Sequence, residues 1–538
     1  MRDVVARRGV WPTPPSVSQL PAAAKEGRTV CGVERVARAP LTTGYRLLTA
    51  ARGSPAVHLM GLGGIGVSGQ ARILLERGYR VSGCDLVPNR LTAELAALGA
   101  TVYQGHDPAH LTGVNLLVIS SAVRPHNPEL VAALAQGLPT VKSAELLAMV
   151  LDGLRTIAVA GTHGKTTTGA LVAALLLDAG LDPTAFIGGE VPALGAGGAP
   201  RNARVGGGAW AVVEADEYDA RFLRLSPTVA IVTSVEADHL DFYGDLAGVR
   251  RAFAAFIARL PRDGALIACA DDPIVMELAA AAPCRVVTYA LDGAADWTAR
   301  ESVLDAAGAR FTLHAPGAEG VTLTTPLSGW HNLANTLAAL AAVAEAGVPP
   351  AAARPTLERF EPPRRRQEPK GRTAQGALVI DDYAHHPTEI RVTLAGLRAR
   401  YPGRRLRVAF QPHTYTRTRA FLAPLGASFG DADEVAVAEV YAARETDTLG
   451  VSGRDVVATA RAAGTSATFT PLLDDVTRWL AADAGPDVVL VTMGAGDIWK
   501  AGERLAVSRQ LSAVSSCLDT TIPVPDETPF DNEIKAEG

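Results

Sequence analysis

The sequence of 538 residues predicts an α/β protein with three domains. Apolar runs of strand length alternate with helical patterns along most of the chain, which is typical of sheets covered by helices. Two of these runs end in glycine-rich turns that lead into helical patterns. The chain is also too long for one ordinary hydrophobic core, so we expect folded units at residues 55–154, 155–371 and 372–505.

The composition describes a soluble globular protein, because 48% of the residues are hydrophobic, 20% are charged and the net charge is −5. This charge gives no reason to expect nucleic acid as a partner. No uninterrupted apolar run reaches the ~20 residues needed to cross a bilayer. Five cysteines without C-x-x-C spacing predict free thiols in a reducing cytoplasm, and they argue against a disulfide framework or a zinc site.

Both ends of the chain differ from the rest. Residues 1–54 are rich in proline and arginine, poor in acidic residues and without sustained periodicity, so we expect a poorly ordered extension. Residues 506–538 place prolines among acidic residues and predict a disordered tail.

The first unit begins at Ala56 with a strand, a glycine turn and a helix, followed by Asp85 at the end of the next strand. The glycines that fit G-x-G-x-x-G are Gly61, Gly63 and Gly66. This pattern predicts a Rossmann-like domain whose turn binds a nucleotide diphosphate, and taken by itself the pattern would suggest NAD. A purely structural tight turn is the alternative. Ser120 and Ser121 end a further predicted strand at 116–121, where open α/β sheets bind ligands.

The central unit is organised around residues 156–177, which read as a buried strand, a phosphate-binding loop and a helix. Gly161 and Gly164 leave the backbone N–H groups open to a phosphate, and the helix N-terminus adds its positive dipole end. Lys165 can reach the β- and γ-phosphates, and the Thr166 hydroxyl can bind Mg²⁺. The loop is shorter than G-x-x-x-x-G-K-[ST], but the strand before it and the helix after it favour nucleotide binding over a chance match.

Acidic groups follow two further strands of this unit, at residues 210–214 and 229–234. Glu214 and His239 would therefore face the same edge as the phosphate loop and hold Mg²⁺ or phosphate, unless they form surface ion pairs or caps. The predicted helix at 331–347 carries Asn332 and Asn335 on one face, where capping alone would also explain them.

The third unit alternates four strands with helices and predicts a second Rossmann-like, mostly parallel sheet. Polar side chains again follow the strands, and loops at that edge carry function in such sheets. These side chains are Asp381, Asp382, His385 and His386 after the first strand, then His413, Arg417 and Arg419 after the second.

Together these sites suggest ATP-driven joining of two substrates across clefts between domains. A carboxylate is a poor electrophile because attack on it would have to expel oxide, and phosphorylation supplies a leaving group. Positioning and Mg²⁺ dominate such phosphoryl transfer, so phosphate donors and metal ligands matter more than a protein nucleophile.

Seven motifs between residues 56 and 505 resemble the Mur ligase family: HLMGLGGIGVSG, GTHGKTTT, EADEYD, VEADHLD, HNLANT, DDYAHHPTEI and FQPHTYTRTR. They are most similar to the members that join L-alanine to UDP-N-acetylmuramate with ATP through an acyl phosphate, in cytoplasmic peptidoglycan synthesis. The resemblance implies a cytoplasmic enzyme, a monomer or weak homodimer, that needs ATP and Mg²⁺.

The resemblance also implies residue roles. Catalytic roles fall to Lys165, Glu214, His239, Arg366 and Asp382. ATP would be bound by Gly161, Thr162, His163, Gly164, Lys165, Thr166, Thr167, Asn332, Asn335, Arg366, Asp382 and His385. Thr166 and Glu214 would hold one Mg²⁺ and His239 a second. UDP-N-acetylmuramate and L-alanine would be bound by Gly61, Gly63, Gly64, Gly66, Asp85, His106, Ser120, Ser121, His386, Arg417 and Arg419.

Several residues depart from the pattern of the alanine-adding members. These are Tyr218 in place of serine, Gln367 in place of phenylalanine, Thr414 in place of arginine, and Lys142 with Ser143 in place of an arginine. Tyr218 resembles the related ligases that recycle a whole tripeptide, which stay open as an alternative. A dinucleotide-dependent oxidoreductase and a nucleotide-binding scaffold are further alternatives, but the first leaves the central phosphate loop without a role.

Overall fold

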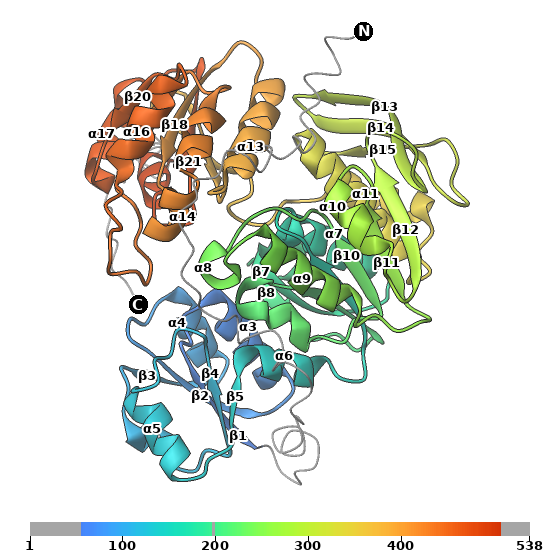
Figure 1. Cartoon of the computed structure of the whole chain (residues 1–538), viewed down its shortest axis with the longest axis vertical. Coiled ribbons are helices and arrows are strands. Elements are labelled where there is room, and N and C mark those ends of the chain that lie inside the picture. The colour runs from blue at the N-terminus through green and yellow to red at the C-terminus, as the bar shows by residue number, and fades with distance from the viewer. Residues whose placement is uncertain (1–54, 196–198, 507–538) are drawn as a thin grey trace, which may run out of the picture.

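The computed structural model describes residues 55–195 and 199–506, and within them the chain forms three lobes around three separate sheets (Figure 1). The predicted N-terminal extension and all but the first residue of the predicted tail lie outside the described residues. Within those residues, no helix combines the length and the apolar character that a membrane span requires.

The first lobe contains a five-stranded, fully parallel sheet in the order β3-β2-β1-β4-β5. Its strands are β1 (Ala56–Met60), β2 (Arg80–Asp85), β3 (Thr101–Gln104), β4 (Leu116–Ile119) and β5 (Thr140–Lys142). Its helices are α3 (Ile65–Glu76), α4 (Arg90–Ala97), the 3₁₀ turn η2 (Pro108–Leu111), α5 (Pro128–Ala135) and α6 (Ser143–Leu151).

Strand β1 is buried on both sides, as its near-continuous apolar sequence predicts for a central parallel strand. Val57 and Leu59 pack into the core shared with α3 and the central lobe. Met60 points to the other face, where it packs with Cys84 and Leu130. The two faces of this sheet therefore have separate cores, and His58 lies on the second face with Met60.

The central lobe contains a ten-stranded sheet in the order β15-β14-β13-β12-β11-β10-β6-β9-β7-β8. Its strands are β6 (Arg155–Ala160), β7 (Thr184–Val191), β8 (Arg201–Arg204), β9 (Trp210–Glu214), β10 (Val229–Val232), β11 (Ala265–Cys269), β12 (Arg285–Ala290), β13 (Trp297–Asp305), β14 (Gly308–His314) and β15 (Val321–Thr325). Its helices include α7 (Lys165–Asp178), η4 (Tyr218–Arg224), α8 (Leu240–Tyr243), α9 (Leu246–Ile257), α10 (Pro273–Ala279), α11 (Trp330–Ala344) and α12 (Arg354–Glu358).

Helices α7 and α11 are almost entirely buried, and their apolar side chains form the largest core of the molecule with the central strands. The predicted strand at 210–214 is β9, and the predicted helix at 331–347 is α11, which begins one residue earlier and ends at Ala344. The antiparallel strands β13, β14 and β15 extend the sheet at one edge, and the sequence reasoning did not identify them.

The third lobe contains a six-stranded sheet in the order β16-β17-β21-β18-β19-β20. Its strands are β16 (Glu368–Arg372), β17 (Leu378–Asp382), β18 (Arg405–Phe410), β19 (Glu434–Val437), β20 (Ala467–Phe469) and β21 (Val488–Met493). Its helices include α13 (Pro387–Arg400), α14 (Tyr415–Ala420), α15 (Leu422–Gly426), α16 (Gly453–Ala462) and α17 (Leu473–Ala482).

The third sheet is parallel except for the edge strand β16, as the alternating pattern predicts. Strand β16 crosses the expected domain boundary at residue 371. Figure 1 shows α8 of the central lobe and α14 of the third lobe next to each other where the two lobes meet.

Candidate active site

The phosphate loop connects β6 to α7, and two of its glycines have backbone conformations that side chains rarely adopt. Gly161 has φ +133°, and a Cβ there would lie 1.9 Å from Thr233 Oγ1. Gly164 has φ +81°, and a Cβ there would lie 2.4 Å from Asn335 Oδ1. Only glycine fits these positions, and the loop wraps closely around the start of α7 as a phosphate cradle requires.

Lys165, the first residue of α7, points back into this loop. Its Nζ donates hydrogen bonds to the carbonyl oxygens of Gly161 and Thr162, at 2.6 and 3.1 Å, and to Glu217 Oε1 at 2.9 Å. Burial lowers the pKa of Lys165, but the carboxylates of Glu217 and Glu214 outweigh burial and hold the pKa above its ordinary value. The ammonium is therefore charged at neutral pH.

Thr166 and Glu214 bring two oxygen ligands together beside the loop. The Thr166 hydroxyl donates to Glu214 Oε2 at 2.9 Å, and the same oxygen accepts the Gly188 backbone N–H at 2.8 Å. Hydroxyl and carboxylate oxygens are the ligands that Mg²⁺ prefers, so this pair fits the ion. Arg366 of the linker reaches the site as well, because its Nη2 lies 3.4 Å from Thr166 Oγ1.

One cavity collects residues from the phosphate loop, α11, the linker and the third lobe. The predicted nucleotide-binding residues that line it are His163, Gly164, Thr167, Asn332, Asn335, Arg366 and Asp382. The two asparagines are buried on one face of α11, where Asn335 Nδ2 donates to Asn332 Oδ1 at 3.2 Å. Residues more than 200 positions apart in the sequence therefore meet beside the phosphate loop.

Asp382 ends β17 and is held by two backbone N–H groups, from Gln367 and Ala384, each at 2.8 Å. Burial raises the pKa of Asp382 to about 6, although the Arg366 guanidinium and the two backbone donors favour the ionised form. His385 lies outside this cavity, and its Nδ1 is 3.0 Å from the Tyr383 carbonyl oxygen. Burial lowers the pKa of His385 to about 4.

His163 joins the phosphate loop to the third lobe. Its ring nitrogens lie 3.4 Å from a carboxylate oxygen of Glu236 and 3.4 Å from one of Glu389, and Glu389 belongs to α13. Burial lowers the pKa of His163, but the two carboxylates outweigh it and raise the pKa to about 9. His386 packs against this ring with centroids 4.7 Å apart, and burial and the His163 charge lower the pKa of His386 to about 4.

A second cavity lies between α8 and α14 and is lined by Tyr218, Asp238, His239, His413 and Arg417, among others. Arg417 donates to both carboxylate oxygens of Asp238, at 2.9 and 3.2 Å, in a buried ion pair that crosses from the third lobe to the central lobe. Burial raises the pKa of Asp238, but Arg417 outweighs it and holds the pKa well below its ordinary value.

Three other predicted site residues lie outside the lining of the first cavity. His239 lines the second cavity, in a left-handed conformation at φ +51°, whereas Thr166 and Glu214 are not part of that lining. His386 lines neither cavity and approaches the Ala237 carbonyl oxygen at 3.3 Å. Arg419 is exposed on α14 and lines neither cavity.

Hydrogen bonds with neighbouring side chains of the first lobe hold its glycine turn in place. The Gly63 N–H donates to Asp85 Oδ2 at 2.8 Å, Asn89 Nδ2 donates to the Gly63 carbonyl at 3.0 Å, and Gly64 precedes α3 as its N-cap. A Cβ at Gly61 would lie 3.1 Å from Ser120 Oγ, so that serine borders the turn. Gly66 lies in the first turn of α3.

Two other predicted residues of this lobe face elsewhere. Ser121 accepts a hydrogen bond from Arg221 of the central lobe. His106 lies 3.4 Å from Glu129, on the face of the sheet that also holds His58.

Sequence reasoning did not single out several residues that shape the site: Glu217, Glu236, Asp238, His331 and Glu389. Glu217, Glu236 and Asp238 stand in the acidic motifs after β9 and β10, so their position could have suggested a role. Their partners could not be read from the sequence, because those partners come from the phosphate loop and from the third lobe.

Comparison with known families finds three models that follow one another along the chain. The model described as Mur ligase family, catalytic domain matches residues 56–155, Mur ligase middle domain matches 159–343, and Mur ligase, glutamate ligase domain matches 365–496. Together they span most of the sequence.

Similar proteins support the same family. The UDP-N-acetylmuramate--L-alanine ligase of Xylella fastidiosa is 44% identical over 465 residues, which are 85% of this chain and 96% of that protein. The protein of the same description from Xanthomonas campestris is 44% identical over 457 residues, which cover 83% and 94% of the two chains.

Two solved structures share the fold of the whole described chain. The Thermotoga maritima UDP-N-acetylmuramate-alanine ligase aligns with a TM-score of 0.73 and 28% identity, over 85% of this chain and 99% of that one. A murein peptide ligase from Psychrobacter arcticus aligns with a TM-score of 0.65 and 25% identity, over 88% and 100% of the two chains.

Proposed function

Because the chain belongs to the Mur ligase family, we propose that it joins L-alanine to the carboxylate of UDP-N-acetylmuramate and converts ATP to ADP and phosphate. The observation that carries this proposal is the first cavity, in which the phosphate loop of the central lobe meets Arg366 and Asp382. A ligase needs this meeting, because groups from two lobes must close around the ATP phosphates and the activated acid and keep water away.

The central lobe supplies the groups for carboxylate activation. Lys165 and the backbone N–H groups of the glycine loop would neutralise and orient the ATP phosphates. Thr166 and Glu214 would hold Mg²⁺, which stabilises the charge that develops on the transferred phosphoryl group. Arg366 lies against Thr166 and adds a second positive charge from the linker.

The second cavity is the proposed place for the amine. Asp238 and Arg417 give it one negative and one positive group, which match the ammonium and the carboxylate of an amino acid. His239 and His413 add imidazole rings to the lining, and burial lowers the pKa of His413 to about 3, so that ring is neutral at physiological pH. The first lobe's glycine turn would bind the UDP diphosphate, with Ser120 beside it.

One observation favours a second candidate substrate. Tyr218 lines the second cavity, with its ring 5.0 Å from that of His239, and a related murein peptide ligase shares the fold. A whole tripeptide in place of L-alanine is therefore the alternative. A dinucleotide-dependent oxidoreductase would leave the phosphate loop and the Asp382 cavity without a role, and no observation favours a scaffold.

The test is a substrate panel in which ADP release is measured with UDP-N-acetylmuramate, ATP and Mg²⁺ plus L-alanine, glycine, L-serine or the tripeptide. We expect release to depend on the sugar nucleotide and to be fastest with L-alanine. Faster ADP release with the tripeptide than with L-alanine would identify the tripeptide as the substrate. No release with any acceptor in the panel would contradict the ligase proposal.

The remaining assignments are also proposals. We place the reaction in the cytoplasm, where ATP and the UDP-sugar are available, and we expect a monomer or weak homodimer. Sedimentation over a range of protein concentrations tests the second point.

A further inference from the structure

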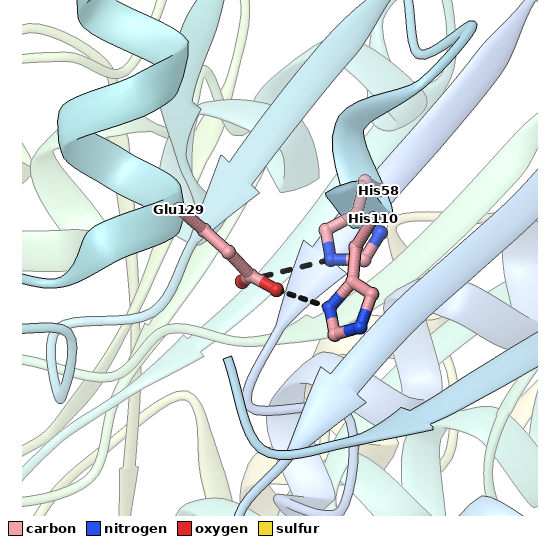
Figure 2. Close-up of side chains that lie close together, drawn as sticks. All are labelled: His58, His110 and Glu129. Carbon is pink, nitrogen blue, oxygen red and sulfur yellow. Dashed lines mark hydrogen bonds and ion pairs between the residues drawn. The ribbon is translucent and has the colours of Figure 1, made fainter. Parts of the chain in front are cut away.

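Histidine, cysteine and glutamate side chains, which can bind metal ions, gather in the first lobe, on the face of the sheet opposite the core shared with the central lobe. They come from β1, β2, the segment after β3, η2 and α5. The five residues are His58, Cys84, His106, His110 and Glu129. Figure 2 shows three of them, with the His58 and His110 rings directed at the Glu129 carboxylate.

Glu129 is at the centre of this cluster although its side chain is fully buried. One carboxylate oxygen lies 2.5 Å from His110 Nδ1 and accepts the Asp107 N–H at 3.2 Å. The other accepts from Cys84 Sγ at 3.0 Å and lies 3.8 Å from His58 Nε2. Glutamate is almost never fully buried without such partners, and this one is surrounded by donors and imidazoles.

His58 is oriented as a metal ligand would be. Its Nδ1 is 2.9 Å from Ser82 Oγ, so the hydroxyl can fix the tautomer in which Nε2 carries a free lone pair. Nε2 is buried and forms no hydrogen bond with any residue that the structure describes. A buried polar atom in that state needs an explanation, and an ion between it and Glu129 supplies one.

The His110 ring is also held in place. It stacks on the Tyr103 ring with centroids 4.0 Å apart and planes 10° apart. Two imidazoles and a carboxylate, all from different elements and all fixed by neighbours, therefore converge within 4.8 Å.

We propose that His58, His110 and Glu129 form a binding site for a divalent transition-metal ion, for which Zn²⁺ is the best match. Imidazole and carboxylate suit this ion, and two histidines with one glutamate are a known zinc ligand set. Ligand atoms about 2.0–2.2 Å from a tetrahedral ion lie roughly 3.3–3.6 Å apart. The 3.8 Å between His58 and Glu129 is close to this, and the His110 ring must withdraw slightly from the carboxylate to admit the ion.

Cys84 and His106 lie on the other side of Glu129 and act as its supports in this arrangement. Cys84 Sγ donates to the carboxylate, and His106 Nδ1 is 3.3 Å from that sulfur. The absence of C-x-x-C spacing argues only against a zinc site built from cysteines, and two histidines with a glutamate are compatible with it.

The site has a structural consequence for the glycine turn of the first lobe. The Cys84 carbonyl accepts the N–H groups of Gly61 and Leu62, at 2.9 and 3.0 Å. An ion that ties β1, η2 and α5 together would therefore steady the strand ends that carry this turn, without taking part in the ligation reaction.

The experiment measures metal bound by the purified full-length chain, with Zn²⁺ as the probe. We expect about one zinc per chain by elemental analysis after dialysis, and a rise in melting temperature when zinc is returned to chelator-treated protein. His110→Gln and Glu129→Gln should each weaken zinc binding by at least about tenfold in competition with a chelating dye. His126→Gln is the matched control, because His126 is an exposed histidine of the same lobe, and it should bind like the unchanged chain.

Glu129→Gln removes a buried carboxylate that accepts several hydrogen bonds, so the folding of this variant is checked by circular dichroism. If Glu129→Gln does not fold, His110→Gln alone tests the proposal. Unchanged zinc affinity in a folded His110→Gln chain, or no zinc binding by the unchanged chain, would overturn the proposal. Cobalt substitution tests the ligands: a thiolate-to-cobalt absorption band that Cys84→Ser removes would overturn this ligand set in favour of Cys84, His106 and Glu129.

Discussion

At the scale of single residues, charges around the phosphate loop compensate one another. Lys165 meets Glu217, and His163 meets Glu236 and Glu389. Each buried cation therefore has a carboxylate within 3.4 Å, which keeps it charged although it is removed from water.

The first prediction concerns Lys165. Lys165→Met keeps the length of the side chain and removes its charge, so kcat for ADP release should fall by at least about 10²-fold. Lys500→Met, at a half-exposed lysine of the third lobe, is the control and should leave kcat unchanged. Steady-state kinetics on both variants measure this effect. Full kcat in Lys165→Met would contradict the role assigned to Lys165.

The second prediction concerns the pH dependence of stability. The pKa of His163 is about 9 in the folded chain and about 6.5 as an ordinary histidine, so its contribution is fully present below pH 6.5 and is lost as pH rises through 9. The difference corresponds to roughly 3 kcal/mol of unfolding free energy. Urea unfolding from pH 7.5 to pH 9.5 should show most of this decrease, because histidines whose pKa burial lowers, such as His385 and His386, are neutral in both the folded and the unfolded chain over that range.

His163→Gln should lose most of the decrease, whereas His314→Gln, at a partly exposed histidine of β14, should keep it. Identical pH profiles for the unchanged chain and His163→Gln would show that the two carboxylates do not hold the imidazolium.

At the scale of elements, the turn between β6 and α7 shows why glycine is required at particular positions. Gly164→Ala places a methyl group 2.4 Å from Asn335 Oδ1 at φ +81°, whereas Gly153→Ala meets nothing within 4 Å at φ +78°. Both variants should lose about 1 kcal/mol of unfolding free energy from backbone strain. Gly164→Ala should lose about 1–3 kcal/mol more, because Asn335 must move.

Urea unfolding measures this difference, and calorimetry with ATP should show weaker binding by Gly164→Ala alone. Equal losses of unfolding free energy in the two variants would mean that the close approach of Asn335 in α11 does not restrict residue 164.

Elements with strong local signals could be predicted from the sequence. The run WAVVE is β9, and GTHGKTTT opens α7 where the glycine turn requires it. The antiparallel strands β13 to β15 were not predicted, because β13 is mostly polar and its second half has no buried position that would mark an apolar face. Their pairing depends on the neighbouring strand β12, which the local sequence does not specify.

At the scale of the whole molecule, several polar pairs cross between the central and third lobes, and the Asp238–Arg417 ion pair is the most direct test of them. Asp238→Asn leaves Arg417 buried without its carboxylate, and breaking a buried pair in this way typically costs about 3–5 kcal/mol. We expect the lobes to separate, seen as a larger radius of gyration in X-ray scattering.

Asp474→Asn is the control, because its pair with Arg504 is exposed and lies within the third lobe. An unchanged scattering profile for Asp238→Asn would indicate that apolar contacts alone hold the lobes together.

The packing of the lobes against one another could not be predicted from the sequence. Polar groups at the ends of β10, β17 and β18 were expected from the strand pattern, and Asp382 does line the cavity of the phosphate loop. The second cavity was not predicted, because its residues His239 and Arg417 come together through lobe packing, which no single segment determines.

Because Lys165 is hydrogen-bonded to Glu217, the Glu217 carboxylate competes with any bound phosphate for the Lys165 ammonium. A phosphate that approaches this ammonium must displace a carboxylate, and that carboxylate then loses the cation that favours its ionised form. Burial already raises the pKa of Glu217. Nucleotide association should therefore draw a proton from solution, so that the heat of binding varies with the ionisation enthalpy of the buffer.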